Sequence, residues 1–498
     1  MHNDAPLWKD RGFLSRFVEA RAWMFVVAIV SVEALVCPGK SRADVVLTSG
    51  EHKLSSTPIL VANGSTVAST PNDFVVVWHE RDYDVDTSKV VGQRYSTTGL
   101  PVGSQFEVVV AGTEEPASPA IATTGEDGSF VVVWNAYTLT TNRVLGQRFD
   151  GSAAKLGAVF QVSSGTSSSH SAVSAAADGS FVVAWIASTE TTTAIKGRRY
   201  DSAGVASFPP KELAAPADEY FNRFALSSAL NGDFVVAWSS GNHVDYLPFF
   251  RQHAISGKLF DAEGAEVTPL SLVQSQGAQR RDGLGIVHKS DGSFVVVFSD
   301  GYYTDVLPPG PFDVFGTTFN SDGTPLLDQI PISVRDSSED EGLNLDASTT
   351  SDGGFVVVWT ALDYSTMTDI RVDGREVDST GAPSGSEFLV TRGLADYPLR
   401  PSVGKTGGEL LITWEEALNA VVARSARSVN PLVCGDGTLD GTITSTDALL
   451  ALQAAIELVF CSVVVCDVDA VPGVTASDAL HILRVAVGFN EALNCPTG

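Results

Sequence analysis

One short apolar pattern, Phe-Val-Val-Val-Trp, recurs with small changes from near the start of this chain to near its end. Its seven copies begin at Phe74, Phe130, Phe181, Phe234, Phe294, Phe355 and Leu410, so successive copies start 51 to 61 residues apart. Such a period is typical of repeat architectures and not of unrelated domains in series. Most of the 498 residues are therefore expected to form one repeating body.

Each repeat contains four short apolar segments, A to D, which predict four β-strands. In the second repeat they are residues 119–123, 130–134, 144–149 and 160–162. Segment B is apolar at every position and rich in Val, Phe and Trp, which predicts a strand buried on both faces. The A–B turns contain Asp-Gly or a close relative, which predicts two-residue hairpins because these residues tolerate positive φ. Four antiparallel strands in each of seven repeats predict a mainly β fold, a seven-bladed β-propeller.

Segment C contains a glycine in six of its seven copies. These are Gly92, Gly146, Gly197, Gly257, Gly316 and Gly374. A glycine inside a strand predicts a bulge or a close backbone approach, here near a crowded axis. The array resembles secreted bacterial β-propeller-type repeat proteins whose blades contain the Phe-Val-Val-Val-Trp pattern.

The last repeat lacks a D segment, and a segment like D stands at the other end of the chain. Residues 45–49, Val-Val-Leu-Thr-Ser, are similar to residues 160–164, Phe-Gln-Val-Ser-Ser. We expect this N-terminal strand to pair into the last blade and close the ring, so the propeller is predicted to span residues 44–430.

Residues 1–43 have the features of an export signal. Basic residues precede an apolar run from Trp23 to Val36, and Ser41-Arg42-Ala43 fits a cleavage site. The prediction is a secreted or cell-surface protein with no membrane span after cleavage, while an uncleaved anchor remains the alternative. The formal charge of -27 argues against nucleic-acid partners and suits binding of cations.

In a four-stranded blade, the B–C loops and the D–A connectors emerge on one face. These segments are long and varied, and variable loops on a rigid scaffold commonly bind ligands. Their aromatic residues predict a face for a glycan or a peptide, with loop anchoring as the alternative role. The residues are Tyr83, Tyr220, Tyr246, Phe249, Tyr302, Tyr303 and Tyr364.

The propeller carries little catalytic signal. It has neither a His-Glu-x-x-His zinc helix nor a Gly-x-Ser-x-Gly elbow, so catalytic residues stay unknown. A glycosidase needs only two suitably spaced carboxylates, which a sequence rich in acidic loops does not exclude.

Beyond a short linker, residues 431–498 change from strand-like to helical composition. Residues 436–447 fit the register of a calcium loop, with Gly441 at the sharp turn. The predicted calcium ligands are Asp436, Thr438, Asp440, Thr442, Thr444 and Asp447.

A second copy of this loop follows 31 residues later, with Asp467, Asp469, Gly473 and Asp478 as predicted ligands. Val471 has no side-chain oxygen and Pro472 replaces the turn glycine, so we expect weaker binding or a structural role only. Apolar periodicity predicts a helix after each loop, at residues 446–458 and 477–487.

Two calcium loops, each followed by a helix and without the leading helix of an EF-hand, resemble a type I dockerin over residues 434 to 495. The resemblance implies calcium as cofactor and a cohesin-type protein module as partner, and so attachment to an extracellular assembly. It also implies partner contacts at Ser445, Thr446, Ala476 and Ser477, which follow the loops as in that family.

Four cysteines, Cys434, Cys461, Cys466 and Cys495, are an addition to the dockerin pattern. Their even number in an exported chain indicates two disulfides. Because the end of one antiparallel helix lies near the start of the other, we favour Cys434 with Cys495 and Cys461 with Cys466, and other pairings stay open.

Two functions follow from these observations. The first is a non-catalytic interaction protein, whose propeller binds a glycan or protein while the dockerin-like module anchors it. The second is a carbohydrate-active enzyme, a glycoside hydrolase acting in polysaccharide breakdown, because dockerins are best known on such enzymes. The lack of catalytic motifs favours the first.

Overall fold

A computed structural model describes residues 44–496 with short gaps at 56–59, 83–84, 164–166, 190–191, 216–219, 244–250, 274–278, 281–282, 303–311, 334–342, 351–352, 363–369, 394–398, 417–419, 430–432 and 470. The predicted export signal, residues 1–43, lies outside the described residues. None of the helices in the described ranges combines the length and the apolar character needed to cross a bilayer.

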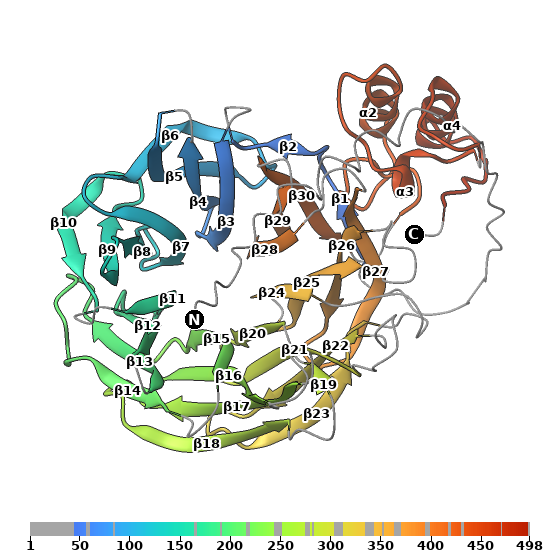
Figure 1. Ribbon diagram of the computed structural model, residues 1–498. Helices are drawn as coiled ribbons and strands as arrows, with labels where there is room; N and C mark the ends of the chain where they lie inside the picture. The colour runs from blue at the N-terminus through green and yellow to red at the C-terminus, as the bar shows by residue number, and fades with distance from the viewer. Residues whose placement is uncertain are drawn as a thin grey trace, which may run out of the picture. The chain divides into compact units, whose positions relative to one another are not determined.

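The strands form seven antiparallel sheets, one for each repeat (Figure 1). The first three contain β3 (Leu60–Ser69), β4 (Asp73–Asp82), β5 (Thr87–Ser96) and β6 (Pro101–Val110); β7 (Glu115–Thr123), β8 (Phe130–Tyr137), β9 (Asn142–Phe149) and β10 (Lys155–Gln161); and β11 (Ser168–Ala175), β12 (Phe181–Ser188), β13 (Thr193–Tyr200) and β14 (Lys211–Ala214). The next two contain β15 (Tyr220–Ser228), β16 (Phe234–His243), β17 (Arg251–Phe260) and β18 (Glu266–Val273); and β19 (Gln279–Arg280), β20 (Leu284–His288), β21 (Phe294–Tyr302), β22 (Phe312–Phe319) and β23 (Pro325–Pro331). The last two contain β24 (Leu343–Thr349), β25 (Phe355–Leu362), β26 (Ile370–Val377) and β27 (Pro383–Arg392); and β28 (Leu399–Thr406), β29 (Glu409–Glu416) and β30 (Ala420–Val429) with the N-terminal strands.

The innermost strands of the sheets form a closed ring. β3, β7, β11, β15, β20, β24 and β28 each contact the next in this order, and β28 contacts β3 again (Figure 1). The seven-bladed β-propeller predicted from the repeat is confirmed.

The outer position of the seventh sheet belongs to the N-terminal segment. β1 (Asp44–Leu47) pairs antiparallel with β30, with Asp44 opposite Val429 and Leu47 opposite Ala426. β2 (His52–Lys53) pairs farther along the same strand. One sheet thus joins the first and last strands of the ring, so opening the ring requires breaking this pairing.

The second strand of each sheet forms the core. In β8, for example, Phe130 to Val133 are fully buried and Trp134 is 1 % exposed. Adjacent sheets cover both faces of each central strand, and Val75 and Val77 of the first sheet pack with Phe130 and Val132 of the second. This two-sided cover explains why segment B is apolar at every position.

The glycine that recurs in the third strands lies against the outer strand of its own sheet. A Cβ built at Gly92 would lie 2.3 Å from the Phe106 ring, and one at Gly374 would lie 2.4 Å from Phe388. The predicted close approach is therefore confirmed, but its expected place near the axis is wrong. The glycine makes room for a side chain of the fourth strand. In these two sheets the side chain is the phenyl ring of Phe106 or Phe388, which packs against the third strand.

Where they contain Asp-Gly or Asn-Gly, the turns between first and second strands differ from the predicted two-residue hairpins, as the third sheet shows. The Ala176 amide donates to the Ser180 carbonyl at 2.8 Å, so three residues form the loop, and within it Gly179 alone has a positive φ, +80°. Asp178 accepts from the Ser180 amide at 2.9 Å. The aspartate thus stabilises the turn through its carboxylate instead of adopting a left-handed backbone.

The C-terminal module contains α2 (Ser445–Ala455), α3 (Val463–Cys466) and α4 (Ala476–Ala486), and α2 packs on α4. α2 ends before the predicted residue 458. Glu457 is left-handed at φ +58°, and the Leu458 amide donates to the Gln453 carbonyl at 3.0 Å, which closes the helix as a Schellman motif.

Candidate functional site

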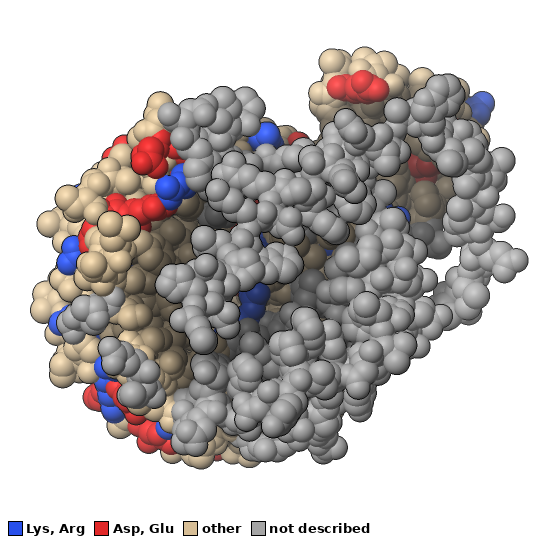
Figure 2. Space-filling view, in the orientation of Figure 1, with Lys and Arg blue, Asp and Glu red and all other residues tan. Residues whose placement is uncertain are grey.

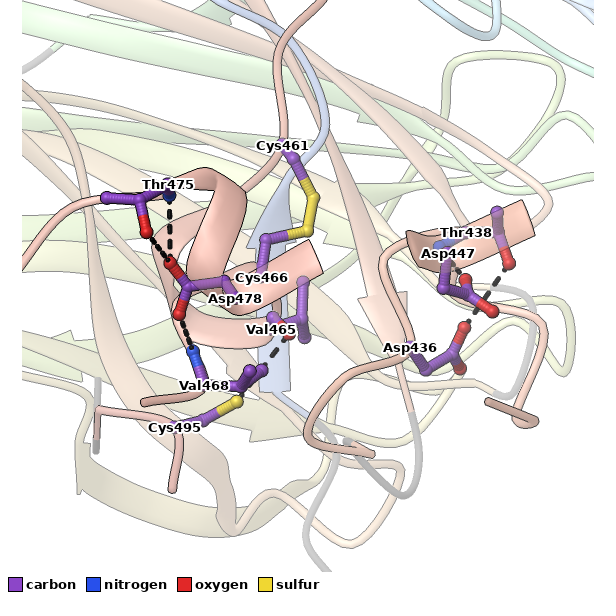
Figure 3. Close-up of a disulfide and its surroundings, with 10 residues drawn as sticks. All are labelled: Asp436, Thr438, Asp447, Cys461, Val465, Cys466, Val468, Thr475, Asp478 and Cys495. Atoms are coloured by element: carbon purple, nitrogen blue, oxygen red, sulfur yellow. Dashed lines mark hydrogen bonds between the residues drawn. A yellow bond between two sulfur atoms is a disulfide. The ribbon is translucent and has the colours of Figure 1, made fainter. Parts of the chain in front are cut away.

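The first acidic loop folds around two buried carboxylates, Asp436 and Asp447, each 0 % exposed. Asp447 accepts from the Thr438 amide at 2.8 Å through Oδ1 (Figure 3). Its Oδ2 accepts from the Thr444 amide at 2.7 Å. Asp436 Oδ2 accepts from the Gly441 amide at 2.6 Å. Among the described residues neither aspartate forms an ion pair with a Lys or Arg. Two buried carboxylates without a cationic partner are costly, so the loop suits a cation.

The remaining predicted ligands of this loop lie nearer the surface. Asp440 is exposed and accepts from Thr442, through the amide at 2.9 Å and the hydroxyl at 2.7 Å. These hydrogen bonds lower the pKa of Asp440 and keep it ionised. Thr444 caps α2, with Asp447 completing a capping box. These contacts join the loop to the start of α2, and the ligand set of the first loop stays a prediction.

The second loop gathers three carboxylates more closely. One oxygen from each of Asp467, Asp469 and Asp478 lies within 4.8 Å of the others. Asp467 is 4 % exposed, and its Oδ1 is buried without a hydrogen-bond partner. Burial, together with the charges of Asp478 and Asp469, raises the pKa of Asp467. An orphaned oxygen among carboxylates fits a hard divalent cation such as Ca²⁺, which prefers oxygen ligands.

The sharp turn of the second loop is present despite Pro472. Gly473 has φ +100° and its amide donates to Asp467 Oδ2 at 2.9 Å. Gly441, at φ +89°, makes the same contact with Asp436 in the first loop. Gly473 therefore stands one residue later in the second loop than Gly441 does in the first. The second loop keeps its turn because Gly473 adopts a similar positive φ to that of Gly441.

Both cysteine pairs that we favoured are present. Cys434 pairs with Cys495 at a Cα–Cα distance of 5.6 Å. Cys461 pairs with Cys466 at 6.1 Å, and Figure 3 shows this bond. The first link joins the start of the module to its end, and the second encloses α3.

The helices α2 and α4 each expose an apolar stripe. On α2 and its C-cap it consists of Leu449, Leu452 and Ile456, and on α4 and its C-cap of Leu480, Leu483 and Val487, with exposed fractions between 40 % and 62 %. Each α4 residue stands 31 positions after its α2 counterpart, the same offset as the two loops. The predicted partner contacts Ser445, Thr446, Ala476 and Ser477 are exposed in the first turns of the same helices.

The predicted aromatic ligand face is not placed by the structure. Tyr83, Tyr246, Phe249, Tyr303 and Tyr364 lie outside the described residues. Tyr220 and Tyr302 belong to β15 and β21, but their side chains are likewise outside the described part. No role of these rings is therefore tested.

The innermost strands line a cavity of about 570 Å³ on the propeller axis, which no pattern in the sequence indicated. It lies toward the ends of these strands that adjoin the D–A connectors and the B–C loops. Its lining includes His170, Arg223, Asn344 and Arg400, from four different blades, beside apolar Phe224. Figure 2 shows Lys and Arg atoms near the middle of this face and also around its edge, where most of the visible Asp and Glu atoms lie.

A β-bulge at matching positions in the innermost strands shapes this cavity. Pairing shifts register between Ser169 and Ser171 in β11, and between Leu399 and Ser402 in β28. The residues at the shifts are left-handed, with φ +47° at His170, +40° at Asn344 and +48° at Arg400. A bulge re-aims a side chain, and such backbone costs about 1–3 kcal/mol at a non-glycine residue.

The two arginines of the cavity contact neighbouring polar side chains. Arg223 donates to the Asn344 side-chain oxygen, and Arg400 Nη1 lies 3.6 Å from Glu415 Oε2. Burial lowers the pKa of His170, and the charges of Arg223 and Arg400 lower it further. Both effects favour the neutral imidazole.

The two carboxylates of the cavity are engaged in contacts between blades. Asp346 accepts from the Ser402 hydroxyl at 2.8 Å and from the Val403 amide at 3.0 Å. Glu415 accepts from the Gly64 amide. Burial raises the pKa of both carboxyl groups.

The sequence does carry a signal for the bulge. Ser118, His170 and Arg400 each precede a Pro or Ser near the start of an innermost strand, at the repeat period. This signal is weak, because these residues look like ordinary strand starts. Only the backbone φ shows which side chain the bulge re-aims.

The fold defines this chain as a seven-bladed β-propeller protein with a C-terminal helical module. No family model and no curated protein matches it. Among solved structures, it is similar to a protein of unknown function from Dyadobacter fermentans DSM 18053 (TM-score 0.45, 10 % identity, 77 % of this chain and 99 % of that one). It is also similar to the polysaccharide lyase Uly1 (0.47, 12 %, 74 % and 90 %) and to the β-propeller domain of the Trilobed protease from Pyrococcus furiosus (0.42, 7 %, 75 % and 97 %). Likenesses this remote carry no argument about function.

Proposed function

We propose that this chain is a secreted, calcium-dependent interaction protein. Its C-terminal module binds calcium and docks on a cohesin-type module, while its propeller binds a glycan. The observation that carries the proposal is the unpartnered, buried Asp467 Oδ1 inside a cluster of three aspartates. An orphaned acceptor at such a site is explained by an ion that completes it.

Calcium is the cation that suits both loops. Their donors are carboxylate and hydroxyl oxygens, with no sulfur or imidazole among the predicted ligands, which disfavours zinc and copper. Asp436 and Asp447 of the first loop, and Asp467, Asp469 and Asp478 of the second, would hold the ion. Bound calcium would offset the mutual repulsion of these carboxylates and tie each loop to the first turn of its helix.

The proposed cohesin contact rests on the stripes of α2 and α4. Exposed apolar side chains in contiguous rows are unusual on a free surface and typical of protein interfaces. Both rows start beside the polar residues that the dockerin resemblance implies as partner contacts. The repetition of the stripe at the loop spacing supports a docking role for the duplicated unit itself.

The proposed glycan ligand belongs to the propeller. The axial cavity combines hydroxyl and amide side chains with an apolar wall, the usual lining of a small-molecule site. Its volume also lies in the range of about 300–1,000 Å³ typical of such sites.

Calorimetric titration of the full chain with Ca²⁺ tests the metal half of the proposal. We expect binding to the first loop that is lost in Asp436→Ala, and binding to the second loop that is lost in Asp467→Ala. Asp322→Ala, at an exposed propeller turn, is the matched control and should bind as the parent does. Absence of calcium binding in the parent chain would refute the proposal.

Capture by an immobilised type I cohesin module tests the docking half. Capture should require Ca²⁺, be reversed by EGTA, and fall at least tenfold in a Leu449→Asp, Leu480→Asp double variant. Leu139→Asp, on an exposed propeller loop, serves as control. Capture that persists in EGTA and is equally strong in the double variant would refute the proposed partner surface.

A glycoside hydrolase is the second candidate, and one observation favours it. Asp346 and Glu415, two carboxyl groups with raised pKa, line the same cavity. Raised carboxyl pKa values suit general acids. Release of reducing ends from a polysaccharide panel, abolished in Asp346→Asn or Glu415→Gln with folding retained, would establish this alternative.

A further inference from the structure

We infer that the Cys461–Cys466 disulfide couples the two acidic loops of the module, so that calcium binding by one loop raises the affinity of the other. This inference rests on the calcium-binding half of the proposed function and adds its regulation, which is cooperative loading. The cysteines are an addition to the dockerin pattern, so the resemblance does not imply this role. The disulfide contributes no predicted ligand, and it acts on both loops as a positioning element.

The disulfide packs on the backbone of the first loop. Gly437 lies between the predicted ligands Asp436 and Thr438, and a Cβ built on it would lie 2.8 Å from Cys466 Sγ and 3.1 Å from Cys461 Sγ. Gly437 is not among the glycines with positive φ, so the approach of the two sulfurs, and not the backbone conformation, explains why a glycine fits here. The first loop therefore has little room to shift at this point without moving the disulfide.

The same disulfide also holds the start of the second loop. Cys466 directly precedes Asp467, the first predicted ligand of that loop, and it is 0 % exposed. The Asp467 carboxylate accepts from the Gly473 amide through Oδ2, and its Oδ1 is the orphaned oxygen of the cluster. Consecutive Cα atoms are about 3.8 Å apart, so a displacement of Cys466 is passed directly to Asp467.

The connection between the loops is buried along its whole length. The Gly435 amide, one residue before Asp436, donates to the Val465 carbonyl, one residue before Cys466, at 2.9 Å. Asp436 is 0 % exposed and Val465 is 1 % exposed. Figure 3 shows the disulfide together with Asp436 of the first loop and Asp478 of the second. Close-packed interiors have low compressibility and transmit strain, so a shift in one loop reaches the other.

Positive cooperativity follows from the order in which ordering costs are met. Calcium binding that fixes one loop also fixes the disulfide packed on it, so the other loop loses less conformational entropy when it binds in turn. Asp447 completes the capping box of α2 and Asp478 that of α4, which joins each loop to one helix. Coupled loading would therefore order both exposed stripes over the same narrow range of calcium concentration.

Calorimetric Ca²⁺ titrations of the full chain test the inference. Asp436→Ala leaves the second loop as the remaining site, and Asp467→Ala leaves the first. The coupling factor is the overall binding constant of the parent divided by the product of these two single-site constants.

The same set of titrations is repeated in a Cys461→Ser, Cys466→Ser background. Ile482→Val, a buried position outside both loops, is the control for a general loss of module stability. Gly437→Ala keeps the covalent link but displaces it from the first loop, and it replaces the serine variant if thermal melting shows that the latter does not fold.

The parent should show a coupling factor of at least about 5, the lower end of the usual range for linked sites. The factor should fall below about 2 in the serine variant and in Gly437→Ala, and it should be unchanged in Ile482→Val. A parent without coupling, a serine variant that retains the coupling, or an equal loss in Ile482→Val would each overturn the inference while calcium binding itself stands. A parent chain that binds no calcium would instead refute the proposed function.

Discussion

The propeller and the C-terminal module achieve stability in opposite ways. The propeller buries seven nearly identical apolar strands between sheets, and no disulfide links its described residues. The module contains two disulfides and five buried or half-buried loop aspartates, and much of the apolar surface of its helices is exposed. A repeated sheet obtains a two-sided core from its neighbours, whereas a module of about 60 residues has too little interior and needs covalent links and an ion.

The two regions also differ in where their functional residues lie. In the propeller, the ring is a scaffold and the variation lies at its loops and at the bulges that face the axis. In the module, the groups expected to bind calcium are the same groups that cap its helices, so folding and binding are linked. Each of the following experiments perturbs one region and uses the other as its internal reference.

The largest effect is expected from a core truncation in the propeller. Phe130→Ala should lower the free energy of unfolding of the propeller by about 3–5 kcal/mol, because the ring is fully buried and leaves a cavity. Leu139→Ala, at a fully exposed loop residue, should change it little. Differential scanning calorimetry should show the module transition unmoved. A shift of both transitions would contradict the separation of the two regions.

Removing the long disulfide should have nearly as large an effect on the module. A Cys434→Ser, Cys495→Ser variant opens a link across 61 residues and should cost about 4 kcal/mol, by loss of loop-closure entropy. The Cys461→Ser, Cys466→Ser variant opens a link across 5 residues and should cost about 2 kcal/mol. Urea denaturation followed by far-ultraviolet circular dichroism of the helices measures both. An equal loss in the two variants would argue against this origin of the stability.

Calcium removal should act on the module and spare the propeller. At a calcium concentration 100-fold above Kd, EGTA should remove about 3 kcal/mol from the module. Asp467→Asn should reduce this gain, because its orphaned oxygen would no longer serve as an anionic ligand. Fluorescence of the buried propeller tryptophans should not change. Loss of propeller structure on calcium removal would contradict the prediction, because it would show that the propeller also depends on a bound ion.

Acid should act mainly on the propeller. Burial lowers the pKa of His79 and of His288 to about 4, with the Arg81 charge contributing at His79. Between pH 6.5 and 4 the unfolded chain binds protons that the folded chain does not, so stability is lost as pH falls through this window. We expect about 1–2 kcal/mol per histidine between pH 7 and 5. His79→Gln should flatten the pH dependence of urea midpoints, and a slope equal to that of the parent chain would refute the assignment.

Local patterns determined much of this protein. The spacing of Phe130 and its six counterparts predicted the number of blades, because each unit buries its core only against a copy of itself. The missing last strand predicted the pairing that β1 makes with β30, since an unpaired edge in a ring needs a partner. The positions of Cys434 and Cys495 at the two ends of the module favoured the link that the structure contains.

Other features were decided only by the tertiary structure. The sequence placed the close approach of Gly92 near the axis, and the fold placed it under Phe106, because a side chain from the neighbouring strand fills the space. The glycine turn of the second loop moved to Gly473, since backbone φ and not register determines which residue can turn. His170, Arg223 and Arg400 stand in three separate repeats, and no local pattern joins them. The sequence by itself determined how the ring is built; only ring closure, which brings distant strands to one axis, decided which side chains meet inside it.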